Sequence, residues 1–308
     1  MDWLVTKRIS TFTNKPYAGN PAWVVIGAHV ADDVSKLAHL ASELNPISGA
    51  VFVFPGDESA DVYLRFFSHS GELNFSGHGT LAAYFGMEGE NIIDLTEPST
   101  VIRQKTKIEI QHLELRVQDN KVERVTVSLR APQFVSTPIE VKQIARLFGI
   151  PPVHIVKTTH PVSVVALSGC TDIVVPIESS DVLLNVKPNF QLIRNYCDRS
   201  RISGVVLYCL DTSDEKYTAH MRYFAPSVGI NEDPVSGSAS ASLGCYLVQN
   251  RLVQMKDMNR LAIEQGYSMK RPGVVYVHVY SQKNQIEKVT FGGQGVVTFE
   301  GRILLPED

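Results

Sequence analysis

The sequence predicts an α+β protein built from two similar halves, and three observations support this. Segments typical of β-strands outnumber segments typical of helices. The two kinds of segment do not alternate regularly, which argues against a doubly wound parallel sheet. A strand–loop–helix unit also occurs twice, once in each half. We therefore expect two pseudo-symmetric domains, each a mostly antiparallel sheet wrapped around one central helix.

β-Branched and aromatic residues between turn residues predict the strands. In the first half they cover residues 4–9, 23–26, 51–54, 62–67, 113–117 and 122–129. In the second half they cover residues 154–156, 162–167, 205–210, 217–224, 274–280, 289–291 and 296–299. Helical periodicity occurs over residues 34–44, 77–87, 139–148, 190–197 and 237–250. The expected domains are residues 1–132 with about 296–308, and residues 133–295.

The repeated unit is an Arg-x-Phe strand, then a glutamate, then Ser-Gly at the start of a helix. The first copy is Arg65, Phe67, Glu72, Ser76 and Gly77. The second copy is Arg222, Phe224, Glu232, Ser236 and Gly237. In both copies the glutamate precedes Ser-Gly by four positions. Two unrelated units of similar sequence are the alternative, but a duplicated domain explains both the order and the content.

Each Ser-Gly predicts a binding site for a small carboxylate. The first N–H groups of a helix have no partner within the helix, and the helix dipole favours an anion there. Gly77, Gly79 and Gly237 let a ligand approach the backbone closely. Ser76 and Ser236 could each be a simple N-cap. For the duplicated pair we favour the binding site.

Three side chains beside these helix starts are candidates for proton transfer: His78, Asp233 and Ser238. The helix dipole at His78 favours a neutral imidazole, although a lone histidine is more often structural. Asp233 precedes Pro234 in a turn, where partial burial would let the carboxyl pass a proton near neutral pH. Its alternative role is to cap that turn.

Short motifs along the whole chain resemble one family. They are Ser10-Thr11-Phe12-Thr13, Gly19-Asn20-Pro21, Gly77-His78-Gly79-Thr80, Ala225-Pro226, Glu232-Asp233-Pro234-Val235-Ser236-Gly237-Ser238-Ala239, Gln265-Gly266, Arg271-Pro272 and Gly292-Gly293-Gln294. On these motifs the chain resembles the PhzF-like branch of the diaminopimelate epimerase superfamily.

The resemblance implies a cofactor-independent isomerase or epimerase of small amino- or hydroxy-carboxylic acids, which moves a proton from one carbon to another. In the epimerase and racemase branches two cysteines are the bases. They map to Ser76 and Ser236, so a two-thiol mechanism is excluded here. In the PhzF branch a glutamate is the main acid/base, assisted at the positions of His78, Asp233 and Ser238.

The chain departs from the family at that glutamate. The segment Ser48-Gly49-Ala50-Val51-Phe52 places Gly49 where the family has the acid, so we expect a gap there that faces the site. His69 and Glu43 are the candidate substitutes. The alternative is an inactive family member that binds a small carboxylate or a protein partner.

Composition sets the remaining expectations. The net charge of −3 gives no electrostatic case for nucleic acid or for an anionic membrane. The first ten residues alternate like a strand and have no long apolar run, so we expect no signal peptide and no membrane helix. The sequence contains four cysteines and no CxxC pair, so we expect reduced thiols in a cytoplasmic protein. They are Cys170, Cys197, Cys209 and Cys245.

Metal and cofactor sites are not expected. The nine histidines show no ligand spacing, so we predict no metal site. The glycines at residues 292–295 precede no helix, which excludes an NAD-binding turn. The expected partner is a small carboxylic-acid substrate, and a homodimer is compatible with the sequence.

Overall fold

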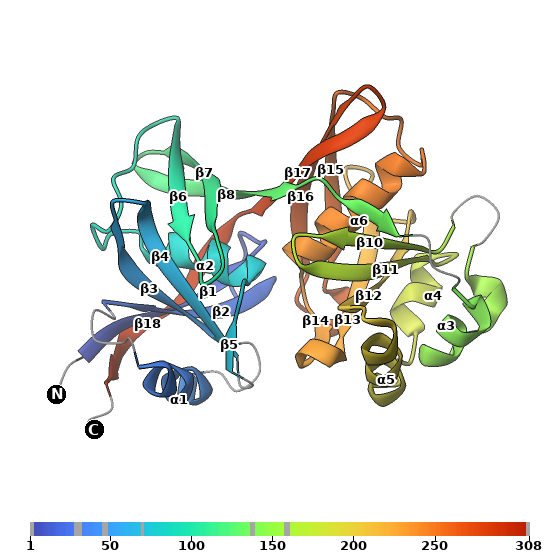
Figure 1. Ribbon diagram of the computed structural model, residues 1–308, viewed down its shortest axis with the longest axis horizontal. Helices are drawn as coiled ribbons and strands as arrows, with labels where there is room; N and C mark the ends of the chain where they lie inside the picture. Colours follow the sequence, from blue (N-terminus) through green and yellow to red (C-terminus); the bar gives the residue numbers. More distant parts are fainter. Residues whose placement is uncertain are drawn as a thin grey trace. The chain divides into compact units, whose positions relative to one another are not determined.

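The computed structural model in Figure 1 describes residues 3–27, 33–44, 49–68, 71–135, 139–156 and 161–305. The chain divides into two compact units. Unit 1 is residues 1–128 with residues 292–308, and unit 2 is residues 129–291. The chain crosses from one unit to the other in strand β8 (Lys121–Arg130) and in strand β17 (Gln285–Gly293).

Unit 1 combines β-strands with two helices. Its other strands are β1 (Trp3–Thr11), β2 (Asn20–Ile26), β3 (Ala50–Asp57), β4 (Ala60–Ser68), β5 (Gly71–Leu73), β6 (Ser99–Lys105), β7 (Ile110–Gln118) and β18 (Gly295–Leu304). Its helices are α1 (Val34–Leu44) and α2 (Gly77–Gly86).

Unit 2 has the same composition with additional helices. Its other strands are β9 (Gln133–Val135), β10 (Ser163–Leu167), β11 (Cys170–Pro176), β12 (Gly204–Cys209), β13 (Ala219–Ala225), β14 (Ile230–Asp233), β15 (Met258–Gln265) and β16 (Gly273–Gln282). Its helices are α3 (Val141–Leu147), α4 (Ser180–Asn185), α5 (Phe190–Ser200) and α6 (Gly237–Gln249). Short 3₁₀ turns cover Pro152–His154, Pro226–Val228 and Tyr267–Met269.

The two units repeat one order of strand pairing. In unit 1, β2 is antiparallel to β1 and parallel to β3, while β4 is antiparallel to β3 and β5 and parallel to β6. In unit 2, β11 is antiparallel to β10 and parallel to β12, while β13 is antiparallel to β12 and β14 and parallel to β15. This matching topology confirms the prediction of an α+β fold in two similar halves.

Each unit is wrapped around one central helix, as predicted. From the third residue of α2 onward every residue is buried, and α6 is buried along almost its whole length. Glycine brings a strand close to each helix. A Cβ on Gly86 of α2 would lie 2.9 Å from Val24 Cγ1, and one on Gly244 of α6 would lie 2.7 Å from Val277 Cγ1. A larger residue at either position would push the strand away from its helix.

The remaining helices cover the other face of each sheet (Figure 1). In unit 1, α1 contributes Leu37, Leu40 and Ala41 to a core with residues of β2, β3 and β4. In unit 2, α3, α4 and α5 bury their apolar sides in a larger core that includes Phe148 and Phe224. Those two rings lie with centroids 5.1 Å apart.

Several elements differ from the sequence prediction. Residues 154–156, expected as a strand, form the end of a 3₁₀ turn and a single bridge between Ile155 and Ile177. The backbone amides of His154 and Ile155 donate to the carbonyls of Pro151 and Pro152, so they are not available to a strand partner. Strands β5, β6, β9, β11, β14 and β15 and the six-residue helix α4 were not predicted.

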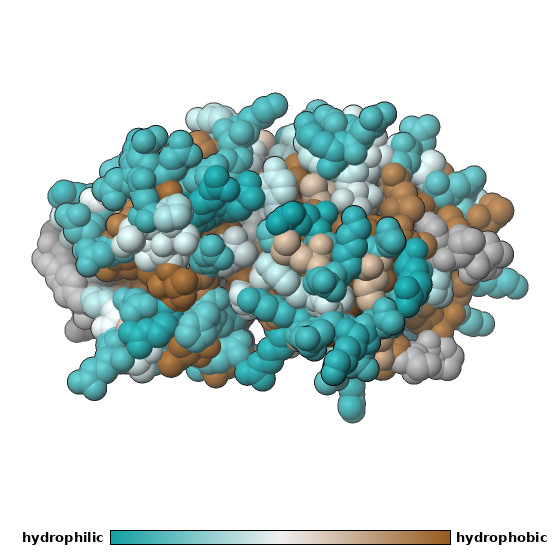
Figure 2. Space-filling model, turned by 90° about the horizontal axis from the view of Figure 1, so that it is seen from above, coloured by the Kyte–Doolittle hydropathy of each residue, from teal (hydrophilic) through white to brown (hydrophobic). Residues whose placement is uncertain are grey.

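The surface is mostly hydrophilic on the face shown in Figure 2, with apolar residues in separate patches. No helix among the described residues is long and apolar enough to cross a membrane.

Candidate functional site

Ser76 sets the start of α2 in unit 1. Its backbone is extended, with φ −144°, and its Oγ accepts a hydrogen bond from Gly79 N at 3.2 Å. The same Oγ lies 3.3 Å from His78 Nδ1. When the hydroxyl proton points at Nδ1, the imidazole carries its own proton on Nε2. His78 is half-buried in the first turn of the helix, so a small ligand can reach it.

Ser236 sets the start of α6 in unit 2 in the same way. Its Oγ accepts from Ala239 N at 3.4 Å and lies 3.5 Å from Ser238 Oγ. Ser236 and Gly237 are buried, whereas Ser238 is half-buried. Both serines are therefore N-caps, and each leaves a polar side chain two residues later in the first turn: His78 in one copy and Ser238 in the other.

A buried ion pair precedes each helix start. Arg65 Nε lies 2.8 Å from Glu72 Oε1, and Arg222 Nε lies 2.8 Å from Glu232 Oε1. Each guanidinium also lies over the ring two residues later, 5.4 Å from the centroid of Phe67 and 5.1 Å from that of Phe224. The hydrogen bond from Arg65 lowers the pKa of Glu72. The repeated glutamates are therefore engaged with arginines and are unsuited to be proton-transfer bases.

Gln265 holds the turn that carries Asp233. Its Nε2 donates to Asp233 O at 2.6 Å, and its Oε1 accepts from Ser236 N at 3.0 Å. Gln265 is 1% exposed, so both hydrogen bonds are shielded from water. The next residue, Gly266, has φ +92°, and a Cβ there would lie 2.2 Å from Arg271 O. The Gln-Gly pair thus fixes Asp233 against the start of α6.

A polar seam between β11 and α6 was not predicted from the sequence. Asp172 is fully buried and accepts hydrogen bonds from Tyr223 Oη and Ser242 Oγ, both at 2.9 Å. Two residues earlier on β11, the Ser238 side chain is near enough to the Cys170 thiol to oppose, in part, the rise that burial causes in the thiol pKa. Residues two apart on a strand are separated by about 6.8 Å, and residues four apart on a helix by about 6 Å. Cys170 and Asp172 on β11 can therefore lie beside Ser238 and Ser242 on α6.

The seam links the candidate residues of unit 2. Tyr223 lies opposite Asp233 in the β13–β14 pair, and Ser238 lies one turn from Ser242 on α6. Burial raises the pKa of Asp172 to about 6 and that of Cys170 to about 12. The available signal in the sequence was an aspartate inside the apolar run of residues 170–176.

The backbone at Gly49 leaves no room for a side chain in its present conformation. It has φ +75°, and a Cβ there would lie 1.9 Å from Phe67 O, because the start of β3 pairs closely with the end of β4. No side chain fits at this position without a change of the backbone, and the expectation that Gly49 leaves a gap facing the site remains a prediction. Glu43 is exposed in the last turn of α1, and Ser48 and His69 lie outside the described residues.

The four cysteines are free thiols, and three of them are buried. In the described part of the chain, no three His, Cys, Asp or Glu side chains gather as a metal site would require. The predicted residues form two groups: Ser76, Gly77, His78 and Gly79 in unit 1, and Asp233, Ser236, Gly237 and Ser238 in unit 2. That the two groups face one ligand remains a prediction.

Comparison with known proteins gives the same family throughout the chain. Residues 9–301 match the family of phenazine biosynthesis-like proteins. An uncharacterized isomerase of Clostridium acetobutylicum is 27% identical over 301 residues, covering 97% of both chains. The trans-2,3-dihydro-3-hydroxyanthranilate isomerase of Pseudomonas aeruginosa is 26% identical over 303 residues, covering 96% of this chain and 98% of the relative.

Solved structures agree with the observed fold. A PhzF-family protein of Bacillus anthracis has a TM-score of 0.87 at 25% identity, over 99% of this chain and all of the other. A hydroxyproline epimerase of Agrobacterium vitis has a TM-score of 0.64 at 11% identity, over 98% of this chain and 91% of the other. This second likeness concerns the fold alone.

Proposed function

The chain belongs to the family of phenazine biosynthesis-like proteins, and we propose that it is a cofactor-independent isomerase or epimerase of a small amino- or hydroxy-carboxylic acid. The observation that carries the proposal is the duplicated helix start. In both units a serine caps a buried helix directly before a polar side chain of its first turn. The named isomerases among the relatives support the same reaction class.

The proposed reaction moves one proton. A base takes a proton from a carbon next to the substrate carboxylate, and an acid returns a proton either to another carbon or to the opposite face of the same carbon. We assign these two roles to His78 and Asp233. The Ser238 hydroxyl and the first N–H groups of the helices would bind the carboxylate and the negative charge that develops on it.

Hydrogen exchange tests this proposal without knowledge of the product. Protein in D₂O is incubated with a panel of small amino and hydroxy acids, and loss of carbon-bound hydrogen is followed by proton NMR. We expect exchange on at least one compound, reduced about 10²–10⁴-fold in His78→Gln and in Asp233→Asn. The exposed residues His112 and Asp119 supply matched controls, and His112→Gln and Asp119→Asn should keep full activity.

The second candidate is a family member that binds a small carboxylate without turning it over. The residue type at position 49 favours it, because glycine carries no carboxyl and cannot move the proton that the family resemblance assigns to a glutamate there. The same panel separates the candidates. An acid that shifts the backbone amide signals of Gly77 and Gly237, yet never exchanges its hydrogens, would identify a binding protein.

A further inference from the structure

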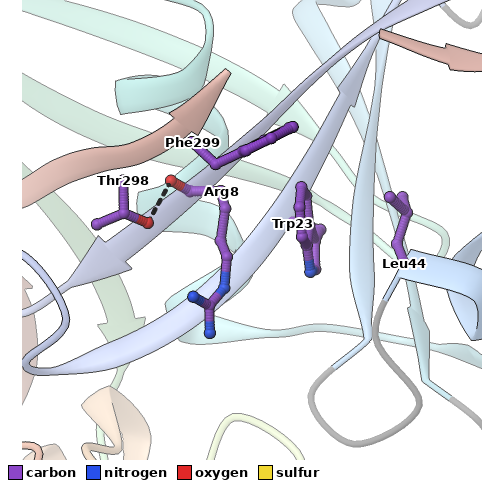
Figure 3. Close-up of a pocket in the computed structure, with 5 residues that line it drawn as sticks. All are labelled: Arg8, Trp23, Leu44, Thr298 and Phe299. Carbon is purple, nitrogen blue, oxygen red and sulfur yellow. Dashed lines mark hydrogen bonds between the residues drawn. The ribbon is translucent and has the colours of Figure 1, made fainter. Parts of the chain in front are cut away.

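A groove in unit 1 combines an arginine with two aromatic rings. Arg8, Trp23, Leu44, Thr298 and Phe299 line a cavity of about 420 Å³ (Figure 3). This volume is within the range of small-molecule sites, roughly 300–1,000 Å³. In Figure 3 Trp23 lies between Arg8 and Leu44, and the Arg8 side chain extends away from the strand.

Strand register places the three largest of these side chains together. Arg8 of β1 lies directly opposite Trp23 of β2 and opposite Phe299 of β18. Directly opposed side chains share one face of a sheet. The Trp23 and Phe299 rings meet edge to face, with centroids 5.3 Å apart.

The aromatic wall is held in place although Phe299 is 48% exposed. A Cβ on Gly301 would lie 2.8 Å from the Phe299 ring, so the ring rests on the bare backbone of that glycine. The register between β1 and β18 shifts after Arg8, and Thr298 Oγ1 donates to Arg8 O at 3.0 Å at this point. The aromatic wall of the groove therefore has little side-chain freedom to lose when a ligand binds.

Arg8 differs from the adjacent cation on the same strand. Lys7 is buried and lies 2.6 Å from Glu90 Oε1. Arg8 forms no ion pair with an acidic side chain among the described residues. A half-exposed guanidinium beside two rings provides two parallel donors for a carboxylate and flat apolar contact for a ring.

The groove lies on the face of its sheet opposite to α2. Val24 contacts α2 at Gly86, and successive strand residues point to opposite faces, so Trp23 points away from α2. The partly buried Trp23 and Leu44 pack instead against the core formed by α1. The groove is thus separate from the helix start that carries His78.

We propose that Arg8, Trp23, Leu44 and Phe299 form a second binding site, for a small aromatic carboxylate. One guanidinium matches one carboxylate, and the two rings match one aromatic body. The site is independent of the proposed isomerase chemistry.

Trp23 gives a direct readout of this site. The chain has two tryptophans, and Trp3→Phe identifies the indole N–H signal of Trp23 in ¹⁵N NMR spectra. The probe is benzoate, with benzyl alcohol as the ring without charge and acetate as the charge without a ring. We expect benzoate to shift the Trp23 signal saturably, and the other two to bind about tenfold more weakly or not at all.

Variants of the protein complete the test. Arg8→Gln should weaken benzoate binding about tenfold or more, and Arg8→Lys less strongly, since it keeps the charge but loses the fork of donors. Arg302→Gln, an exposed arginine of β18, is the matched control and should bind as the unmodified chain does. Folding of each variant is checked by the Trp3 signal and by far-UV circular dichroism.

Three results would overturn the proposal. They are the absence of any benzoate effect on Trp23, an equal effect in Arg8→Gln, and an equal effect of benzyl alcohol. A Trp23 signal that changes on dilution without probe would instead assign the groove to contact between copies of the chain.

Discussion

Asp172 shows how one buried residue links stability to pH. Its carboxyl has no access to water, so burial raises its pKa from 3.8 to about 6 despite hydrogen bonds from Tyr223 and Ser242. In the unfolded chain the carboxyl ionises near its usual pKa. Between these two values the unfolded state loses its proton and the folded state keeps it, so the contribution of Asp172 to stability falls as pH rises.

Asp172→Asn should therefore change the pH dependence of unfolding. The shift from 3.8 to about 6 corresponds to about 3 kcal/mol, which the uncharged amide of the variant would not lose as pH rises from about 4 to 7. We expect the variant to gain stability relative to the unmodified chain over this range, measured by urea unfolding at both pH values. A constant difference between the two proteins would show that Asp172 does not titrate with a raised pKa.

Gly49 allows the cost of a steric clash to be separated from that of backbone conformation. Gly49 and Gly89 both have positive φ, +75° and +82°, but only Gly49 has an atom in the path of a Cβ. We expect Gly89→Ala to cost about 1 kcal/mol for its conformation, and Gly49→Ala to cost distinctly more. Equal losses in urea unfolding would mean that the turn at Gly49 can open. Only then could Gly49→Glu test the missing base.

At the scale of elements, Gln265 is the contact that ties the end of β15 to the turn before α6. Its two hydrogen bonds, to Asp233 O and from Ser236 N, span the segment that precedes the capped helix start. Because these groups are buried, removing the amide takes one hydrogen bond from Ser236 N and one from Asp233 O, at a cost of about 1–3 kcal/mol.

Gln265→Ala should loosen this turn locally. We expect faster hydrogen exchange at the Ser236 amide, together with a loss of unfolding free energy of about 1–3 kcal/mol. Gln282→Ala, at an exposed position of β16, should change neither quantity. Unchanged protection of the Ser236 amide in Gln265→Ala would assign the rigidity of the turn to other contacts.

Two of the longer strands missed from the sequence, β6 and β15, have a shared cause. β15 turns Asn259, Leu261, Ile263 and Gln265 inward, so its inward row begins and ends with a polar residue. β6 buries Gln104, which meets Tyr84 Oη at 3.1 Å. A polar residue that points inward interrupts the alternation of apolar and polar residues by which a strand is identified in a sequence. Its burial depends on hydrogen-bond partners from other elements, which the local sequence does not show.

The repeat and the helix starts could be predicted, because their signals are local. Ser76 and Ser236 precede runs of small and apolar residues, and both are caps in the structure. The conformation of Gly49 could not be predicted, since it depends on the carbonyl of Phe67, which lies far along the chain and meets Gly49 only through β3–β4 pairing. The polar seam at Asp172 depends likewise on three separate elements.

At the scale of the whole molecule, the two units differ in how the chain builds them. Unit 2 is one continuous segment, residues 129–291. Unit 1 needs both ends of the chain, because β1 pairs along its whole length with β18, and Leu305 belongs to its core. Both tryptophans, Trp3 and Trp23, lie in unit 1. Tryptophan fluorescence therefore reports on unit 1 alone, while circular dichroism reports on both units.

Truncation should separate the two units. A chain that ends at residue 291 lacks β18, so β1 loses a strand partner and the unit 1 core loses Leu305. We expect its tryptophan emission to shift to the red, as for solvent-exposed indoles, while circular dichroism keeps one cooperative urea transition. The fragment of residues 129–291 should show that same transition, because it contains all of unit 2. If the truncated chain kept the emission of the full chain, β18 would be dispensable to unit 1. If the fragment failed to unfold cooperatively, unit 2 would depend on unit 1 despite its continuous chain.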